Sequence, residues 1–186
     1  MASAKKDHIH SSKTVRIASL TAAIVISIAV FLLREQISSL QNYGYAGIFF
    51  ISILGNATIV LPMPVILVTF LGGGVFNPVI VGIISGIGST IGELTGYLAG
   101  YGGAVAVEKN EKFKKITKKM EKHGFATLFT LSLIPNPFFD LAGIAAGLMH
   151  FSVTKFFTAT VLGKTIRYLG IAHLGAGSVG VMGNLF

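Results

Sequence analysis

Very few ionisable side chains interrupt the long apolar stretches of this chain, and their chemistry stands out. They are Glu93, Asp140, Lys164 and Arg167. A charged side chain in a membrane interior costs about 3 kcal/mol on insertion scales, so such residues are rare there and usually functional. They can carry a proton, bind a cation or hold the charged group of a substrate. We therefore take these four, together with the amide of Asn136, as candidate substrate residues.

A structural role is the main alternative for these charges. Asp140 follows a proline-rich element by three residues, and it could pair with Lys164 or Arg167 and so hold its segment in place. The amides of Asn136 and Asn56 are weaker candidates, because such side chains can simply cap interrupted helices. The sequence leaves transport chemistry and a structural ion pair open for Asp140.

Composition places the chain among membrane proteins. Of its 186 residues 52% are hydrophobic and 12% are charged, which is too apolar for an ordinary soluble domain. The absence of cysteine excludes disulfides, thiolate metal sites and cysteine nucleophiles. The chain has no phosphate-binding loop, no nucleophile elbow and no His-x-x-x-His pair. We therefore expect neither an enzyme nor a cofactor or metal.

The net charge of +8 comes from lysines and arginines in two short segments rather than from a broad basic face. One segment covers residues 1–16, and the other is a loop over residues 108–123 with seven lysines. This distribution argues against nucleic acid as a partner and is typical of the cytoplasmic side of a membrane protein. We predict an amphipathic helix in the loop, with Phe113, Ile116 and Met120 on one side. Its lysines either attract anionic lipid headgroups, over residues 109–122, or act only as a topology anchor.

The first apolar run, residues 17–33, is long enough to cross roughly 30 Å of hydrocarbon. A signal peptide is the alternative, but the run is long for one and no small-x-small cleavage site follows it. We expect a membrane helix with a cytoplasmic N-terminus. Further full spans are predicted near residues 79–101 and 152–171, and a glycine-rich tail over residues 176–186.

Two proline-bracketed elements occur at matching places in the remaining sequence. They are Leu61-Pro62-Met63-Pro64 and Ile134-Pro135-Asn136-Pro137, and glycine follows each first proline by twelve residues, at Gly74 and Gly147. A shift of 73 positions superimposes the two elements. Interrupted segments at corresponding positions in two halves typically mark the substrate site of a transporter.

Proline removes a backbone donor, so these elements would leave carbonyl groups unpaired if they faced lipid. We read each as the turn of a re-entrant hairpin. The predicted fold is an all-α integral membrane domain over residues 17–175, an inverted repeat with two opposed re-entrant helical hairpins plus about three full transmembrane helices. The halves cover about residues 45–101 and 124–173. Shifting Glu93 by 73 positions places it opposite Ile166, beside Arg167, so related positions carry opposite charges.

Two stretches resemble a known family. Residues 132–143 read Ser-Leu-Ile-Pro-Asn-Pro-Phe-Phe-Asp-Leu-Ala-Gly, and residues 92–100 contain an acidic-x-x-Gly-Tyr-x-x-Gly pattern with Gly96, Tyr97 and Gly100. These are similar to the core motifs of the DedA superfamily, also called the VTT or SNARE-associated domain, and most of all to its vacuole membrane protein branch. The resemblance covers about residues 40–175.

The resemblance implies a membrane protein with two facing re-entrant hairpins that translocates lipids. Bacterial relatives are linked to recycling of undecaprenyl phosphate, and eukaryotic relatives to phospholipid scrambling. Tyr101 and Ser132 occupy regions where bacterial members usually carry arginines, which disfavours arginine-dependent, proton-coupled transport.

The expected function is therefore lipid translocation, by a phospholipid scramblase or a polyprenyl-phosphate flippase. The alternatives are a proton- or ion-coupled small-solute transporter that uses Glu93 or Asp140, and a membrane scaffold. Membrane lipids are the expected partners, and glycine-lined helix faces make a homo-oligomer plausible. Short length and the absence of sorting signals suggest a prokaryotic plasma membrane.

Overall fold

The computed structural model describes residues 17, 21, 43–57, 65–103, 111–135 and 139–183. Over these ranges the chain forms helices and no strands, so the predicted all-α class is confirmed for the described part. The helices are α3 (Tyr45–Ala57), α4 (Val65–Val75), α5 (Pro78–Tyr101), α6 (Glu111–Leu133), α7 (Phe139–Leu148) and α8 (Val153–Gly183).

Several predicted features lie outside the described residues. They are the first span over residues 17–33, apart from helical Ile17 and Thr21, and six residues of the proline-rich elements, namely Leu61, Pro62, Met63, Pro64, Asn136 and Pro137. Pro135 is described and is exposed directly after α6.

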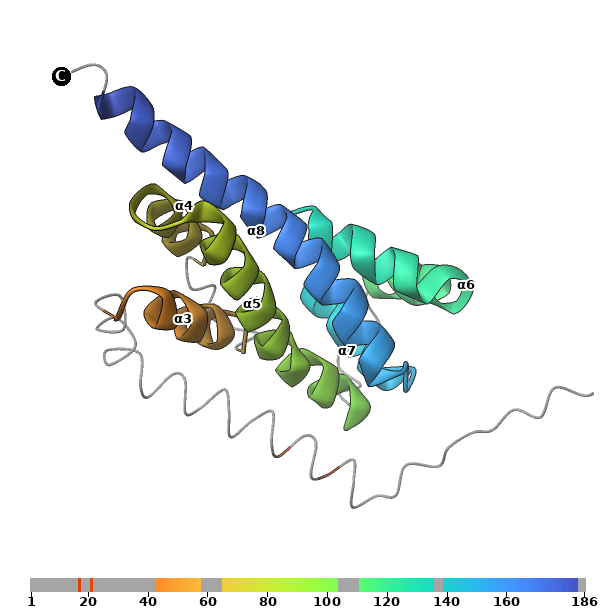
Figure 1. The fold of residues 1–186 in the computed structure, drawn as a ribbon. Helices are drawn as coiled ribbons and strands as arrows, with labels where there is room; N and C mark the ends of the chain where they lie inside the picture. Colours follow the sequence, from red (N-terminus) through yellow and green to blue (C-terminus); the bar gives the residue numbers. More distant parts are fainter. Residues whose placement is uncertain are drawn as a thin grey trace, which may run out of the picture.

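The two long helices α5 and α8 lie side by side and antiparallel at the centre of the fold (Figure 1). Their backbones approach closely because glycine faces the partner helix. A Cβ atom on Gly82 would lie 2.7 Å from the Cα of Leu169, and one on Gly86 would lie 2.6 Å from the Cα of Thr165. Small residues spaced four apart thus let two helices pack without intervening side chains, as the sequence predicted.

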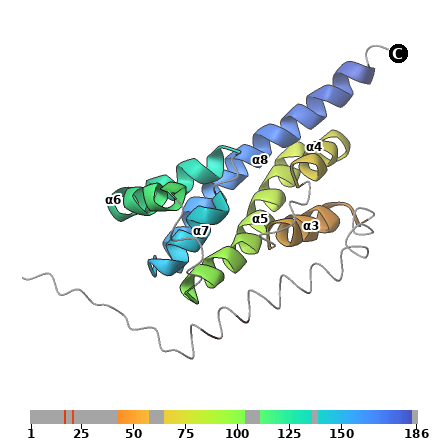
Figure 2. The same ribbon diagram turned by 180° about the vertical axis from the view of Figure 1, so that it is seen from behind.

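The shorter helices cover opposite ends of this central pair. α3 and α4 lie toward the start of α5, whereas α6 and α7 lie along the first half of α8 (Figures 1 and 2). α4 packs mainly on α8, and α7 packs on α5. α4 and α7 therefore each pack mainly on the long helix of the other predicted half, whereas α3 packs on α5 of its own half. Glycine again permits the approach, since Gly175 meets the carbonyl of Phe70 and Gly100 meets that of Ile144.

α5 begins where the sequence predicts. Pro78 is its first residue, and the side chain of Asn77 caps it by accepting hydrogen bonds from the amides of Val79 and Ile80, at 3.0 and 3.3 Å. Proline suits this position because its missing amide would have no intrahelical partner. Among the described helices, α5 is the one long and apolar enough to cross a membrane by length and composition.

α8 differs from expectation in its length. It continues to Gly183, past residues 171 and 175, where we expected the span and then the domain to end. The contact of Gly175 with α4 explains why, since the packing against α8 continues beyond the predicted boundary. Three basic residues lie on this helix, namely Lys155, Lys164 and Arg167, and they lower its hydropathy.

α6 consists of two arms that meet at His123, where the backbone is not helical (φ −141°, ψ 52°). In the first arm Phe113, Ile116 and Met120 are buried, so the predicted apolar face is confirmed. That face packs on the protein core beside Tyr97 rather than standing free. The described lysines of this arm whose exposure is resolved remain exposed.

Removing the close approach of α5 and α8 should destabilise the protein. We expect Gly86→Ala to lower the free energy of unfolding by about 1–3 kcal/mol, because the new methyl group overlaps the backbone of α8. Gly170→Ala is the matched control, since Gly170 is exposed and no described atom lies within 4 Å of its added Cβ. Thermal unfolding of the detergent-solubilised proteins measures the stability of the two variants. Equal melting temperatures for the two would contradict the packing described above.

Candidate functional site

A buried ion pair between α5 and α8 is the centre of the candidate site. The Nζ of Lys164 donates a hydrogen bond to Oε1 of Glu93 at 2.6 Å. Their side chains are only 1% and 5% exposed. Burying one such charge without a partner costs several kcal/mol, so each of these two groups requires the other.

The same ammonium group reaches a third helix. Nζ of Lys164 also donates to Oδ1 of Asn56 in α3, at 3.0 Å. The amide nitrogen of Asn56 in turn donates to Oγ of Ser89 and to the carbonyl of Ser52, each at 3.0 Å. The described polar atoms thus form a connected network across α3, α5 and α8, which is the arrangement that makes buried polar groups tolerable.

Glycines in α5 bring α3 close enough for this network. A Cβ on Gly88 would lie 2.7 Å from the carbonyl oxygen of Phe49, and one on Gly92 would lie 2.9 Å from the backbone of Asn56. Gly92 directly precedes Glu93, so the bare helix surface and the carboxylate are adjacent. The short distance between α3 and α5 is what allows Asn56 to reach Lys164.

The start of α7 completes the surroundings of Lys164. Nζ lies 5.1 Å from the ring centroid of Phe139, within the range of a cation–π contact. Asp140 follows Phe139 and interacts electrostatically with both Glu93 and Lys164. It is half-buried, and within the described ranges its carboxylate makes neither a hydrogen bond nor an ion pair. The pairing of Asp140 with Lys164 or Arg167, considered above as a structural role, is therefore not formed as a direct contact.

Lys164 joins residues that adjoin both proline-rich elements. Asn56 lies one residue before the end of α3, which leads into the first element, and Phe139 comes two residues after Pro137 in the second. One side chain of α8 therefore contacts the ends of both interrupted segments. These segments are far apart in the sequence, and the central helix pair brings their flanking residues together.

Arg167 lies one helical turn beyond Lys164. Its guanidinium carbon is 4.7 Å from the ring centroid of Tyr168, and its buried Nε has no hydrogen-bond partner among the residues that the structure describes. The 73-residue shift predicted Glu93 beside Arg167, but the residue that pairs directly with Glu93 is Lys164. Arg167 acts on Glu93 only as a more distant charge. The formal charges of the two basic and the two acidic groups sum to zero.

The other predicted residues of α5 have packing positions. Tyr97 donates from its hydroxyl to the carbonyl of Phe151 at 2.6 Å, and Gly96 is buried one residue earlier. Gly147 of α7 lies against the carbonyl of Tyr97, and Gly100 against α7 as described above. The backbone nitrogen of Gly74 lies close to Gly175 of α8. Gly100 and Gly147 therefore let α5 and α7 approach closely, whereas a Cβ atom added to Gly96 would meet nothing within 4 Å.

Sequence reasoning missed three members of the network, namely Ser52, Ser89 and Phe139, and considered Asn56 only as a helix cap. One signal was available for Ser89, since it precedes Glu93 by four residues and so shares a helix face with it. No sequence pattern indicated that α3 would supply an acceptor to a lysine more than 100 residues away.

Comparisons with known proteins agree with these motifs. The model of the VTT domain family matches residues 61–177. Vacuole membrane protein 1 of Homo sapiens is 43% identical over 61 residues, which cover 32% of this chain and 14% of the relative. Vacuole membrane protein KMS1 of Arabidopsis thaliana is 36% identical over 64 residues, covering 34% and 15%. The chain therefore matches about one seventh of the length of these relatives. No solved structure gives a significant match.

The buried pair should show strong coupling in a double-mutant cycle. We expect Glu93→Gln and Lys164→Met each to cost about 3–5 kcal/mol of stability, because each leaves one charge buried without its partner. The double variant should lose much less than the sum. Thermal unfolding in detergent measures the cycle, and Glu111→Gln, which removes an exposed carboxylate, is the control and should have little effect. Strictly additive losses would show that Glu93 and Lys164 do not depend on each other.

Proposed function

The chain belongs to the VTT domain family of membrane proteins, and on this premise we propose that it moves phospholipids between the leaflets of its membrane. The observation that carries the proposal is the meeting of residues from both interrupted segments at Lys164. Lipid translocation needs a polar path for the headgroup at membrane depth, and polar groups at that depth are otherwise costly.

We further propose that α3 with α4, and the second arm of α6 with α7, form two re-entrant hairpins of opposite orientation. α4 and α7 have 11 and 10 residues, which gives each a length of roughly 15 Å, about half of the hydrocarbon thickness. Shifting α4 by 73 positions gives residues 138–148, and α7 covers nearly the same residues. α4 of the first half packs on α8 of the second half, and α7 of the second half packs on α5 of the first half. This reciprocal packing supports an inverted repeat. A prokaryotic plasma membrane and a cytoplasmic N-terminus remain predictions.

The polar residues have two different roles in this proposal. Glu93, Lys164 and Asn56 are already engaged with one another, because Lys164 donates to both of the others, so they hold the hairpins against the central helices. Asp140 is half-buried beside this network, and we assign it the contact with the amine of a passing headgroup. Arg167, with its unpartnered Nε, is assigned to the phosphate. Asn136, beside the second hairpin, stays a predicted member of the path.

Acyl chains would remain in the lipid during this movement, and the helix surfaces are suited to that. Large apolar side chains are exposed along α4 and the first half of α5, and they include Ile66, Leu67, Leu71, Ile80 and Ile83. Such a contiguous apolar surface is expected where a protein faces lipid. A headgroup in the polar site and tails along this surface would satisfy both parts of the substrate.

Translocation should depend on Asp140 in a reconstituted system. In proteoliposomes with fluorescent phospholipid, dithionite should rapidly quench the inner-leaflet label of the wild type. We expect Asp140→Asn to slow this phase at least about tenfold, which corresponds to losing about 1.4 kcal/mol of headgroup stabilisation. Glu111→Gln makes the same chemical change on the exposed surface of α6 and should keep the wild-type rate.

Other results would change either the proposed function or the proposed role of Asp140. Quenching no faster than in empty liposomes, from folded protein, would reject lipid translocation and favour an ion-coupled solute transporter or a scaffold. Normal rates in Asp140→Asn would remove Asp140 from the path. Collapse of Asp140→Asn during purification would assign it a structural role instead.

The inverted repeat predicts opposite accessibility for two equivalent positions. Val79 and Ser152 are 73 residues apart, and both are exposed near the start of a long helix. Because the chain has no cysteine, Val79→Cys and Ser152→Cys each introduce a single reactive thiol. A membrane-impermeant maleimide should label Val79→Cys from outside the cell and Ser152→Cys only after permeabilisation. Labelling of both from the same side would contradict the inverted repeat.

A further inference from the structure

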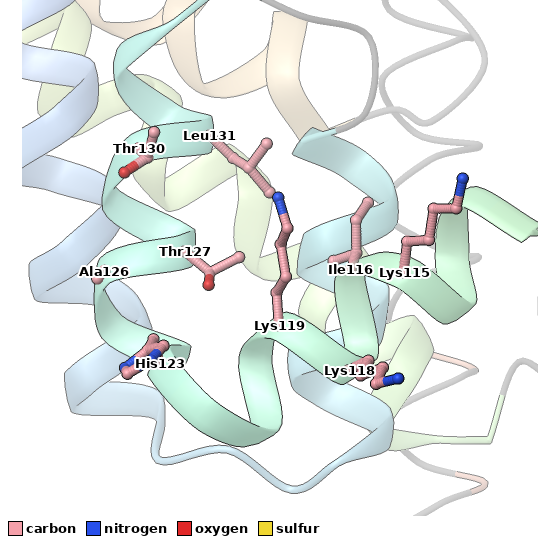
Figure 3. A pocket seen from close by; sticks show the side chains of 9 residues that line it. All are labelled: Lys115, Ile116, Lys118, Lys119, His123, Ala126, Thr127, Thr130 and Leu131. Atoms are coloured by element: carbon pink, nitrogen blue, oxygen red, sulfur yellow. The ribbon is translucent and has the colours of Figure 1, made fainter.

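The bend of α6 forms an open pocket that is separate from the Lys164 network. It has a volume of about 580 Å³ and lies between the two arms of the helix (Figure 3). The first arm contributes Lys115, Ile116, Lys118 and Lys119, and the second contributes Ala126, Thr127, Thr130 and Leu131, with His123 at the bend. The pocket exists because the backbone leaves the helical conformation at His123, which sets the two arms at an angle.

The lining combines two chemical characters. Three lysines line the pocket without any carboxylate among the lining residues, and the hydroxyl groups of Thr127 and Thr130 add hydrogen-bond capacity. Ile116, Ala126 and Leu131 add an aliphatic part, and His123 completes the lining at the bend. Figure 3 shows the side chain of Lys119 extending between the arms toward Leu131, so its ammonium lies over this aliphatic part.

We propose that this pocket binds one anionic phospholipid, with the phosphate among the lining lysines, where Lys119 extends between the two arms (Figure 3), and the glycerol and first acyl carbons on the aliphatic lining. A freely soluble phosphate would use the lysines but would gain nothing from the apolar wall. A zwitterionic lipid carries a positive group that three lysines would repel. An anionic lipid matches both the charge and the apolar area.

The site does not depend on the proposed translocation. None of its lining residues belongs to the network around Lys164, and the first arm of α6 is held by its own buried face. The sequence alone predicted only a general attraction of anionic headgroups to residues 109–122. The structure adds the second arm, so that the basic helix surface becomes one wall of an open cleft between the two arms.

Lipid binding can be measured by native mass spectrometry of the full chain in detergent, titrated with phosphatidylglycerol or with phosphatidylcholine of the same acyl chains. We expect one phosphatidylglycerol to remain bound to the wild type. Changing Lys115 and Lys119 together to glutamine should weaken this binding by roughly thirtyfold. The control changes Lys114 and Lys122 to glutamine, which removes the same charge from the same helix outside the pocket.

A second variant tests the pocket without changing charge. Ala126 is exposed and lines the pocket, so Ala126→Trp should fill the space and abolish binding while the fold is retained. If both double variants weaken lipid binding equally and Ala126→Trp has no effect, the pocket is rejected. The lipid would then be held by a diffuse attraction to the lysines of the helix. Equally tight binding of phosphatidylcholine would reject the selectivity. Displacement of the lipid by equimolar glycerol 3-phosphate would assign the pocket to soluble phosphates.

Discussion

The ammonium group of Lys164 imposes the constraint on which the rest of the described structure depends. A lysine buried in an apolar helix bundle is tolerated only if its donors are satisfied and its charge is balanced. Glu93 supplies the charge, Asn56 a second acceptor and Phe139 an aromatic face. These three residues come from α5, α3 and α7. Satisfying one side chain of α8 therefore fixes the positions of three other helices at once.

The glycines of α5 make that solution geometrically possible. Different glycines of this helix face α8, α3 and α7, so one helix can be approached closely on three sides. Larger residues at Gly88 or Gly92 would move α3 away and leave the ammonium of Lys164 without its second acceptor. The many small residues of the sequence thus serve the polar site as well as the packing.

The sequence could predict the elements better than their pairing. Hydropathy and capping signals located α5, and the proline elements located the boundaries of α4 and α7, because these features are local. The candidate residues Glu93 and Lys164 were also predictable from the cost of buried charge. Their partnership was not, since the register between α5 and α8 is set by contacts such as that of Gly86 with Thr165. The break in α6 at His123 falls at the predicted boundary between the amphipathic loop, residues 108–123, and the second half, residues 124–173, and the buried face of the first arm was also predicted.

The two polar features of the molecule make different electrostatic demands on a lipid. Around Lys164 two acidic and two basic side chains balance, and two of these four are already engaged in an ion pair. The remaining Asp140 and Arg167 offer one charge of each sign, which suits a zwitterionic headgroup. A simple ion carries one sign of charge and could pair with only one of these two side chains. In the bend of α6 the lysines are the charged lining residues and no carboxylate accompanies them, so the pocket favours a lipid with net negative charge. The first site is thus suited to a substrate that must leave again, whereas the second is suited to a lipid that stays bound.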